Sequence, residues 1–181
     1  MYLRRLGRLA PLAALGALAL SNAPVSAHVD VGADTAVAGA ATLVEFSYNH
    51  GCGESPTTAV RFQIPEAVNV VYPTVHPGYD IEVVRAAAPE GSVDSHGNPV
   101  DERVSEILYT AKEPVANGLR DVIVLQAVMP DTPGETVYFP TIQSCVEGEH
   151  AWIEIPGEDQ SADDLSNPAP GFLLVEAEDG H

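Results

Sequence analysis

Residues 41–48 read Ala41-Thr-Leu-Val-Glu-Phe-Ser-Tyr48, and residues 121–128 read Asp121-Val-Ile-Val-Leu-Gln-Ala-Val128. Both runs are rich in the β-branched and aromatic residues that favour extended strands. Runs of similar character recur at 58–64, 68–72, 81–85, 104–109, 136–139, 151–155 and 172–175. Turn-forming Pro, Gly, Asn and Asp separate them, and helical periodicity is almost absent. We therefore expect an all-β fold, an antiparallel β-sandwich that forms a single domain.

The first 27 residues are typical of a cleavable export signal. Three arginines precede the apolar run 9–20, and Val25-Ser-Ala27 offers small residues at the cleavage positions. The alternative is a membrane anchor, but the apolar run is shorter than the ~20 residues that a bilayer span needs. We expect residues 1–27 to be a signal peptide and the mature protein to begin at His28. That protein would be periplasmic or secreted, without stable insertion into a membrane.

The composition limits the classes of partner. Removal of the three leader arginines leaves five basic side chains against 26 acidic ones, a formal charge of −21. Such a surface repels the phosphates of nucleic acids and the headgroups of anionic lipids. Cations and basic proteins are the favoured partners, although a general surface charge also serves solubility. The remaining length fits one domain, which we place at residues 28–175, followed by an acidic tail at 176–181.

The sequence contains two cysteines, Cys52 and Cys145. In an exported chain such a pair predicts one disulfide. The alternative is a pair of thiolate metal ligands. Oxidising conditions and the absence of a Cys-x-x-Cys spacing make the disulfide the preferred interpretation.

His28 is a candidate copper ligand once the leader has been removed. An N-terminal histidine offers its α-amino nitrogen and a ring nitrogen to one metal ion, which closes a chelate ring. Nitrogen donors in a flat arrangement suit Cu(II), which heads the divalent affinity order. The alternative is an ordinary N-terminus at which the first residue happens to be histidine.

The loop 49–57 is a second candidate. A disulfide from this loop to the second cysteine would gather side chains of metal-binding or aromatic character: His50, Glu54, Glu149, His150 and Trp152. The alternative is a surface loop with incidental charges and a tryptophan that belongs to the core. His76 and His96 lie in turn sequences, and we expect both in solvent.

These motifs carry a resemblance to a known family. The matching blocks are Ala27-His-Val29, His50-Gly-Cys-Gly-Glu-Ser-Pro-Thr-Thr-Ala-Val-Arg61, Val137-Tyr-Phe-Pro-Thr-Ile-Gln-Ser-Cys145, and Glu147-Gly148 with Trp152. In this order they resemble the YcnI-like domain, which is associated with bacterial copper handling. One departure is Tyr79, which stands where relatives often have tryptophan.

The resemblance implies an immunoglobulin- or cupredoxin-like sandwich that binds one Cu(II) through a single-histidine brace. His28 would supply amine and ring nitrogen, and Trp152 would lie close to the metal. The acidic ligand would be Glu54, which lies in the matching loop. The family's acidic position shifts around the His-Gly-Cys insertion, so His50 is the alternative.

The preferred function is therefore an exported copper-binding protein in periplasmic copper trafficking or storage, with Cu(II) as the bound ion and other periplasmic copper chaperones as partners. We expect no enzymatic activity. One alternative is a metal-free β-sandwich module for adhesion or assembly. Another is a copper-dependent oxidase, which would need a second brace histidine and a flat aromatic face, whereas only 6% of the residues are aromatic.

Overall fold

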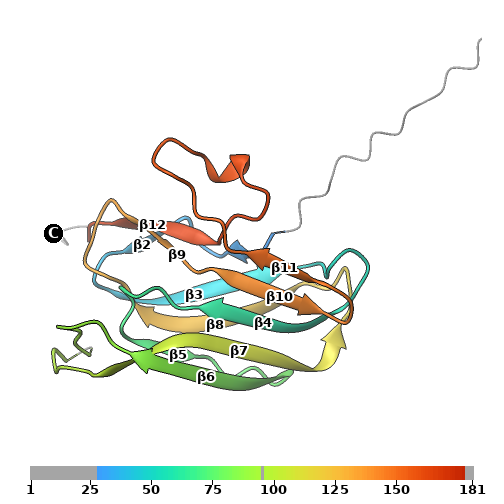
Figure 1. Ribbon diagram of the computed structural model, residues 1–181, viewed down its shortest axis with the longest axis horizontal. Helices are drawn as coiled ribbons and strands as arrows, with labels where there is room; N and C mark the ends of the chain where they lie inside the picture. Colours follow the sequence, from blue (N-terminus) through green and yellow to red (C-terminus); the bar gives the residue numbers. More distant parts are fainter. Residues whose placement is uncertain (1–27, 95, 178–181) are drawn as a thin grey trace, which may run out of the picture.

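Figure 1 shows the fold of the computed structural model, which describes residues 28–94 and 96–177. The predicted signal peptide, residues 1–27, lies outside the described residues. So does most of the predicted acidic tail, whose first residues, 176 and 177, form no strand or helix.

Two antiparallel sheets form the main layers of the sandwich. The first has the order β1-β3-β8-β5, built from β1 (Asp30–Val31), β3 (Ala41–Tyr48), β8 (Asp121–Val128) and β5 (Val71–Pro73). The second has the order β11-β10-β4-β7-β6, built from β11 (Glu149–Trp152), β10 (Thr141–Cys145), β4 (Thr57–Gln63), β7 (Glu102–Val115) and β6 (Tyr79–Ala87). The predicted all-β sandwich is confirmed.

A smaller third sheet has the order β2-β12-β9, with β2 (Thr35–Val37), β12 (Gly171–Val175) and β9 (Thr136–Tyr138). Here β12 pairs with β2 in parallel, which departs from the expected antiparallel arrangement. Parallel neighbours need a long connection, and almost the whole domain lies between these two strands in sequence. Their pairing therefore ties the beginning of the domain to its end.

The core lies between the two main sheets. Phe46 of β3 packs against Phe62 of β4 with ring centroids 4.5 Å apart, so the sheets meet face to face. Phe139 contacts Phe46 at 5.5 Å, and Tyr109 contacts Phe62 at 6.1 Å. Alternation along β3 places Val44, Phe46 and Tyr48 inside, as a half-buried strand requires.

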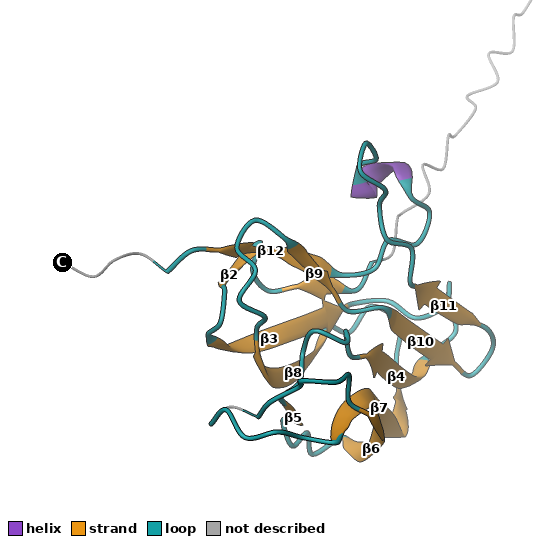
Figure 2. Cartoon of the chain, turned by 60° about the vertical axis from the view of Figure 1, so that its left-hand side comes forward, coloured by secondary structure: helices purple, strands orange, loops and turns teal. Residues whose placement is uncertain are grey.

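Three strands were not expected from the sequence: β1, β2 and β10. Several others have shifted ends; β7, for example, is longer than the predicted strand at 104–109. The segment between β11 and β12 carries a short 3-10 helix, η1 (Ala162–Asp164), and stands away from the sheets (Figure 2). No helix in the described part of the chain is long and apolar enough to cross a membrane.

Candidate functional site

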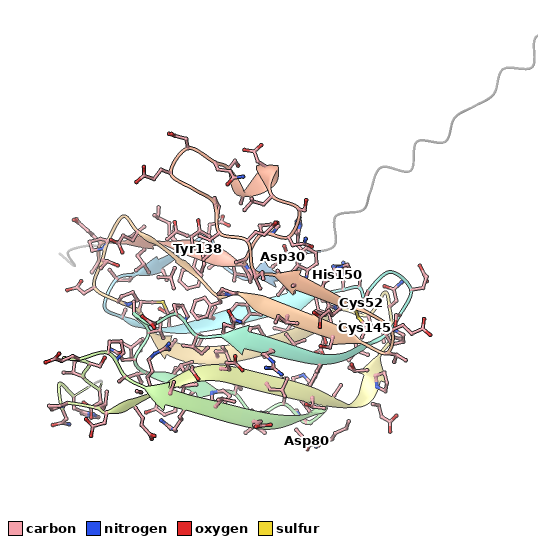
Figure 3. The ribbon with its side chains drawn as sticks, viewed as in Figure 1. Asp30, Cys52, Asp80, Tyr138, Cys145 and His150 are labelled. Atoms are coloured by element: carbon pink, nitrogen blue, oxygen red, sulfur yellow. A yellow bond between two sulfur atoms is a disulfide. The ribbon has the colours of Figure 1, made fainter. Side chains whose placement is uncertain are left out.

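The disulfide predicted between Cys52 and Cys145 is present, with Cα atoms 6.0 Å apart (Figure 3). It fixes the loop that follows β3 to the end of β10. The loop is closed on itself by reciprocal backbone hydrogen bonds of 3.1 and 3.2 Å between Cys52 and Ser55. Neither cysteine is a free thiol, so the thiolate alternative does not apply.

Three of the predicted site residues meet at this end of the sandwich. The His28 ring lies edge-on to the Trp152 ring, with centroids 5.5 Å apart and planes at 63°. His50 belongs to the loop 49–57, and its Nε2 lies 3.3 Å from the His28 carbonyl oxygen. Trp152 is 3% exposed, so the interpretation that it belongs to the core is confirmed. Its ring also lies beside that of His28, whereas its place beside a metal stays a prediction.

The position of His50 depends on a buried glutamine. Gln143 of β10 donates a 2.6 Å hydrogen bond to the His50 carbonyl oxygen and a 2.7 Å bond to Thr57 Oγ1. Gln143 has no exposed surface, and its Oε1 is buried without a hydrogen-bond partner. In the sequence, Gln143 lies two positions before Cys145, and this closeness to the predicted disulfide was the only signal for it. Sequence reasoning gave Gln143 no role.

Glu54 is hydrogen-bonded to the turn between β7 and β8. Its Oε2 accepts a hydrogen bond of 3.4 Å from Asn117 Nδ2, in the turn between β7 and β8. Asn117 Oδ1 also accepts a 3.2 Å hydrogen bond from the Gly51 amide, so Asn117 joins the loop 49–57 to the β7–β8 turn. The structure thus brings His50 to His28 and directs the exposed Glu54 toward the β7–β8 turn.

His150 is the third imidazole at this end of the sandwich. Its ring lies 5.2 Å from the Trp152 ring at an angle of 36°, and it is half-buried. Figure 3 shows His150 on the same end of the molecule as Asp30 and the disulfide. Glu149, its neighbour, is exposed.

An acidic surface hollow of about 470 Å³ adjoins His28. It lies between β1 and the segment that carries η1, and three of its lining residues are carboxylates: Asp30, Asp34 and Asp163. Such a concentration of negative charge raises the local concentration of cations. Sequence reasoning missed it because these three residues come from both ends of the domain.

Within residues 28–94 and 96–177, no group of three or more His, Cys, Asp or Glu side chains is arranged to hold a metal ion. A single-histidine brace at His28 would use one donor that is not a side chain. The α-amine that cleavage in front of His28 would release is such a donor.

A second polar cluster lies where β3 ends, just before the His50 loop. Tyr79 donates a 2.6 Å hydrogen bond to Asp121 Oδ2, and its hydroxyl lies 2.5 Å from that of Tyr48. Burial, and for Tyr79 also the bond to Asp121, raises the pKa of both tyrosines well above the usual value. His76 Nε2 pairs with Asp121 Oδ1 at 3.3 Å, so the expectation that His76 lies in solvent was wrong, whereas His96 is exposed.

The chain is similar to solved structures to different degrees. A protein from Nocardia farcinica, described as having an immunoglobulin-like fold, is 24% identical, with a TM-score of 0.63 over 82% of this chain and 98% of that one. The seventh ScaB type I cohesin of Pseudobacteroides cellulosolvens is 9% identical, with a TM-score of 0.39 over 86% and 96%. The first similarity supports an immunoglobulin-like fold, and the second is too weak to support any inference.

No protein of curated function matches the chain. A family match, however, covers nearly all of the described residues. Residues 28–174 match the family described as domain of unknown function (DUF1775), and the chain therefore belongs to that family.

Proposed function

We propose that the mature protein is an exported copper-binding protein of the YcnI-like kind, which holds Cu(II) through the α-amine and ring of His28. It would act in periplasmic copper trafficking or storage, with copper as its cargo and no catalytic step. The observation that carries the proposal is the meeting of His28 with Trp152, at 5.5 Å between rings, and with His50, at 3.3 Å.

The donor set fits this ion. An amine and two imidazoles are the nitrogen donors that Cu(II) prefers, and neutral imidazole has a lone pair to offer. His50 is better supported than Glu54 as the further ligand, because Glu54 is hydrogen-bonded to Asn117 in the β7–β8 turn. The buried indole of Trp152 would form an apolar wall that limits the access of water to the metal.

The charge around His28 also favours a cation. Asp30, Asp34 and Asp163 line the hollow beside it. In a chain with 26 acidic side chains, this hollow would draw in Cu(II) and the basic surfaces of partner proteins. Other periplasmic copper proteins are the partners with which such a carrier would exchange its metal.

The proposal makes cleavage of the leader a condition for binding. While Ala27 is attached, the His28 nitrogen belongs to a peptide bond and is no amine donor. Cleavage in front of His28 would convert it into an α-amine, which deprotonates more readily than a lysine because its ordinary pKa is near ~8.

Copper titration tests the proposal. Cu(II) is titrated, in competition with a chelator of known affinity, into protein that begins at His28 and into protein that keeps Ala27. We expect the extension to weaken binding by more than about 100-fold, because it removes a direct ligand. His28→Ala should weaken binding as well, and the control His96→Ala should leave it unchanged.

Equal affinity with and without Ala27 would contradict the brace. Failure of every form to bind copper would favour the metal-free adhesion or assembly module instead. Peroxide-driven turnover by the copper-loaded protein would favour the oxidase.

A further inference from the structure

His150 has a position that differs from those of the other histidines near the site. It lies on β11, an edge strand of the five-stranded sheet, and is half-buried. Its register partner on β10 is Gln143, the residue that holds the His50 carbonyl oxygen. His150 therefore stands at the margin of the sheet, one strand away from the loop that carries His50.

One buried indole connects His150 with His28. The Trp152 ring lies 5.2 Å from the His150 ring and 5.5 Å from the His28 ring. The two imidazoles reach it from different strands, because His150 belongs to β11 and His28 precedes β1. His150 and His28 therefore border the same indole ring.

His150 is nevertheless outside any ready-made coordination sphere. In the described residues, no three His, Cys, Asp or Glu side chains are arranged as a metal site, although His28, His50 and His150 all lie at this end. A nearby nitrogen donor that is not part of the chelate is suited to temporary coordination during ligand exchange.

Two buried polar atoms on the strands β10 and β11 have no hydrogen-bond partner. They are Gln143 Oε1, an acceptor, and Trp152 Nε1, a donor. Directly opposite residues on neighbouring strands point to the same face, and the register pairs are Gln143 with His150 and Thr141 with Trp152. Both unpartnered atoms therefore share the face of His150, and such groups require an explanation in a folded protein.

We propose that His150 is a transfer ligand, which coordinates Cu(II) on its way between an external carrier and the His28 site. The inference rests on the proposed function. In each exchange a nitrogen of neutral His150 forms a bond to Cu(II) as one bond to the departing donor breaks. The copper remains Cu(II) throughout, so no electron acceptor is needed.

The only tryptophan of the chain supplies the readout, because the Trp152 ring lies beside His28 and Cu(II) bound there would quench its fluorescence. Mature protein is mixed with a Cu(II)–glycine complex in a stopped-flow instrument, and the loaded protein is mixed separately with excess chelator. The rates of uptake and removal are measured for wild type, His150→Phe, His150→Gln and the control His96→Ala. The His150→Phe variant keeps an aromatic ring against Trp152 but has no nitrogen donor. The His150→Gln variant provides the same test if His150→Phe does not fold.

We expect both His150 variants to slow uptake and removal by about tenfold or more. The dissociation constant, measured by chelator competition, should stay unchanged, because a ligand used only during exchange stabilises neither the free nor the loaded protein. Unchanged rates would overturn the inference and leave the proposed function standing. Faster removal with weaker equilibrium binding would overturn it too, because His150 would then be a permanent ligand. If wild type binds no copper, the proposed function fails, and the inference fails with it.

Discussion

The side-chain amide of Gln143 donates a 2.6 Å hydrogen bond to the carbonyl oxygen of His50. This bond fixes the backbone of the predicted copper ligand to β10 of the sandwich. The same amide nitrogen binds Thr57 Oγ1, so one buried side chain holds the loop and the start of β4 together.

We predict that Gln143→Leu lowers the free energy of unfolding by about 2–3 kcal/mol, because it leaves the His50 carbonyl and the Thr57 hydroxyl buried without a donor. Copper affinity should fall by about tenfold as His50 loses its position. Urea denaturation and copper titration measure the two effects. The control Gln126→Leu, an exposed site on β8, should stay within about 0.5 kcal/mol of wild type; an equal loss in both variants would contradict the role of Gln143.

Gly51 lies where a side chain would clash with the backbone of its own loop. A Cβ atom at this position would lie 1.8 Å from the Ser55 carbonyl oxygen. We predict that Gly51→Ala destabilises the fold by about 1–3 kcal/mol, because the turn closed by Cys52 and Ser55 must open to admit the methyl group. Gly157→Ala is the matched control, since a Cβ there meets nothing within 4 Å. Thermal unfolding of both variants distinguishes a packing clash from a general effect of replacing glycine.

The disulfide closes a long loop, because Cys52 and Cys145 are 93 positions apart in the sequence. Removing it by the double change Cys52→Ala, Cys145→Ala should lower the free energy of unfolding by about 2–5 kcal/mol, because the unfolded chain regains conformational freedom. Unfolding curves of wild type with and without a reductant provide the comparison. If the reductant leaves the wild-type curve unchanged, the bond contributes nothing to stability and the prediction is wrong.

The local sequence pattern was sufficient to predict the strands in which buried and exposed side chains alternate. The bounds of β3 and β8 agree with the runs 41–48 and 121–128, because each strand has one apolar face on the core. β10 was missed because Thr141, Gln143 and Ser144 look like a loop. The first two are fully buried, and hydrogen bonds to Phe139, His50 and Thr57 satisfy part of their polarity. His50 and Thr57 are brought there by the folded chain, which local propensity cannot include.

The candidate site, too, could be predicted only in part from the sequence. The two cysteines predicted a bond that draws together the His50 loop and β10, and this bond is present. The direction of Glu54 could not be predicted, because its partner Asn117 lies 63 positions away in another turn. His76 was misplaced for the same reason, since Asp121 reaches it from a different strand.

Alkaline solution should destabilise the protein through its buried tyrosines. Burial raises the pKa of Tyr109 to about 12 and those of Tyr48 and Tyr79 still further, whereas tyrosine in an unfolded chain has a pKa near ~10. The unfolded chain therefore loses these protons first. The stability they contribute is complete below pH ~10 and is lost as the pH rises toward the folded values.

We expect the free energy of unfolding to be level up to pH ~10 and to fall between about pH 10 and 12. Urea denaturation at half-unit intervals, with tyrosinate absorbance as a second probe, measures the fall. Tyr109→Phe should make it shallower, because one of the raised groups has been removed. A free energy that stays constant to pH ~11.5 would contradict these pKa directions.

The choice between His50 and Glu54 as the further copper ligand can be decided by paired substitutions in protein that begins at His28. His50 Nε2 lies 3.3 Å from the His28 carbonyl oxygen, whereas the Glu54 carboxylate is bound by Asn117. We therefore predict that His50→Ala weakens Cu(II) binding by more than about tenfold, and that Glu54→Gln changes it by less than about threefold. Electron paramagnetic resonance of the loaded proteins should show one coupled nitrogen fewer in the His50 variant and the wild-type spectrum in the Glu54 variant. The opposite result would mean that copper draws the loop into a new conformation, with Glu54 released from Asn117 and turned toward His28.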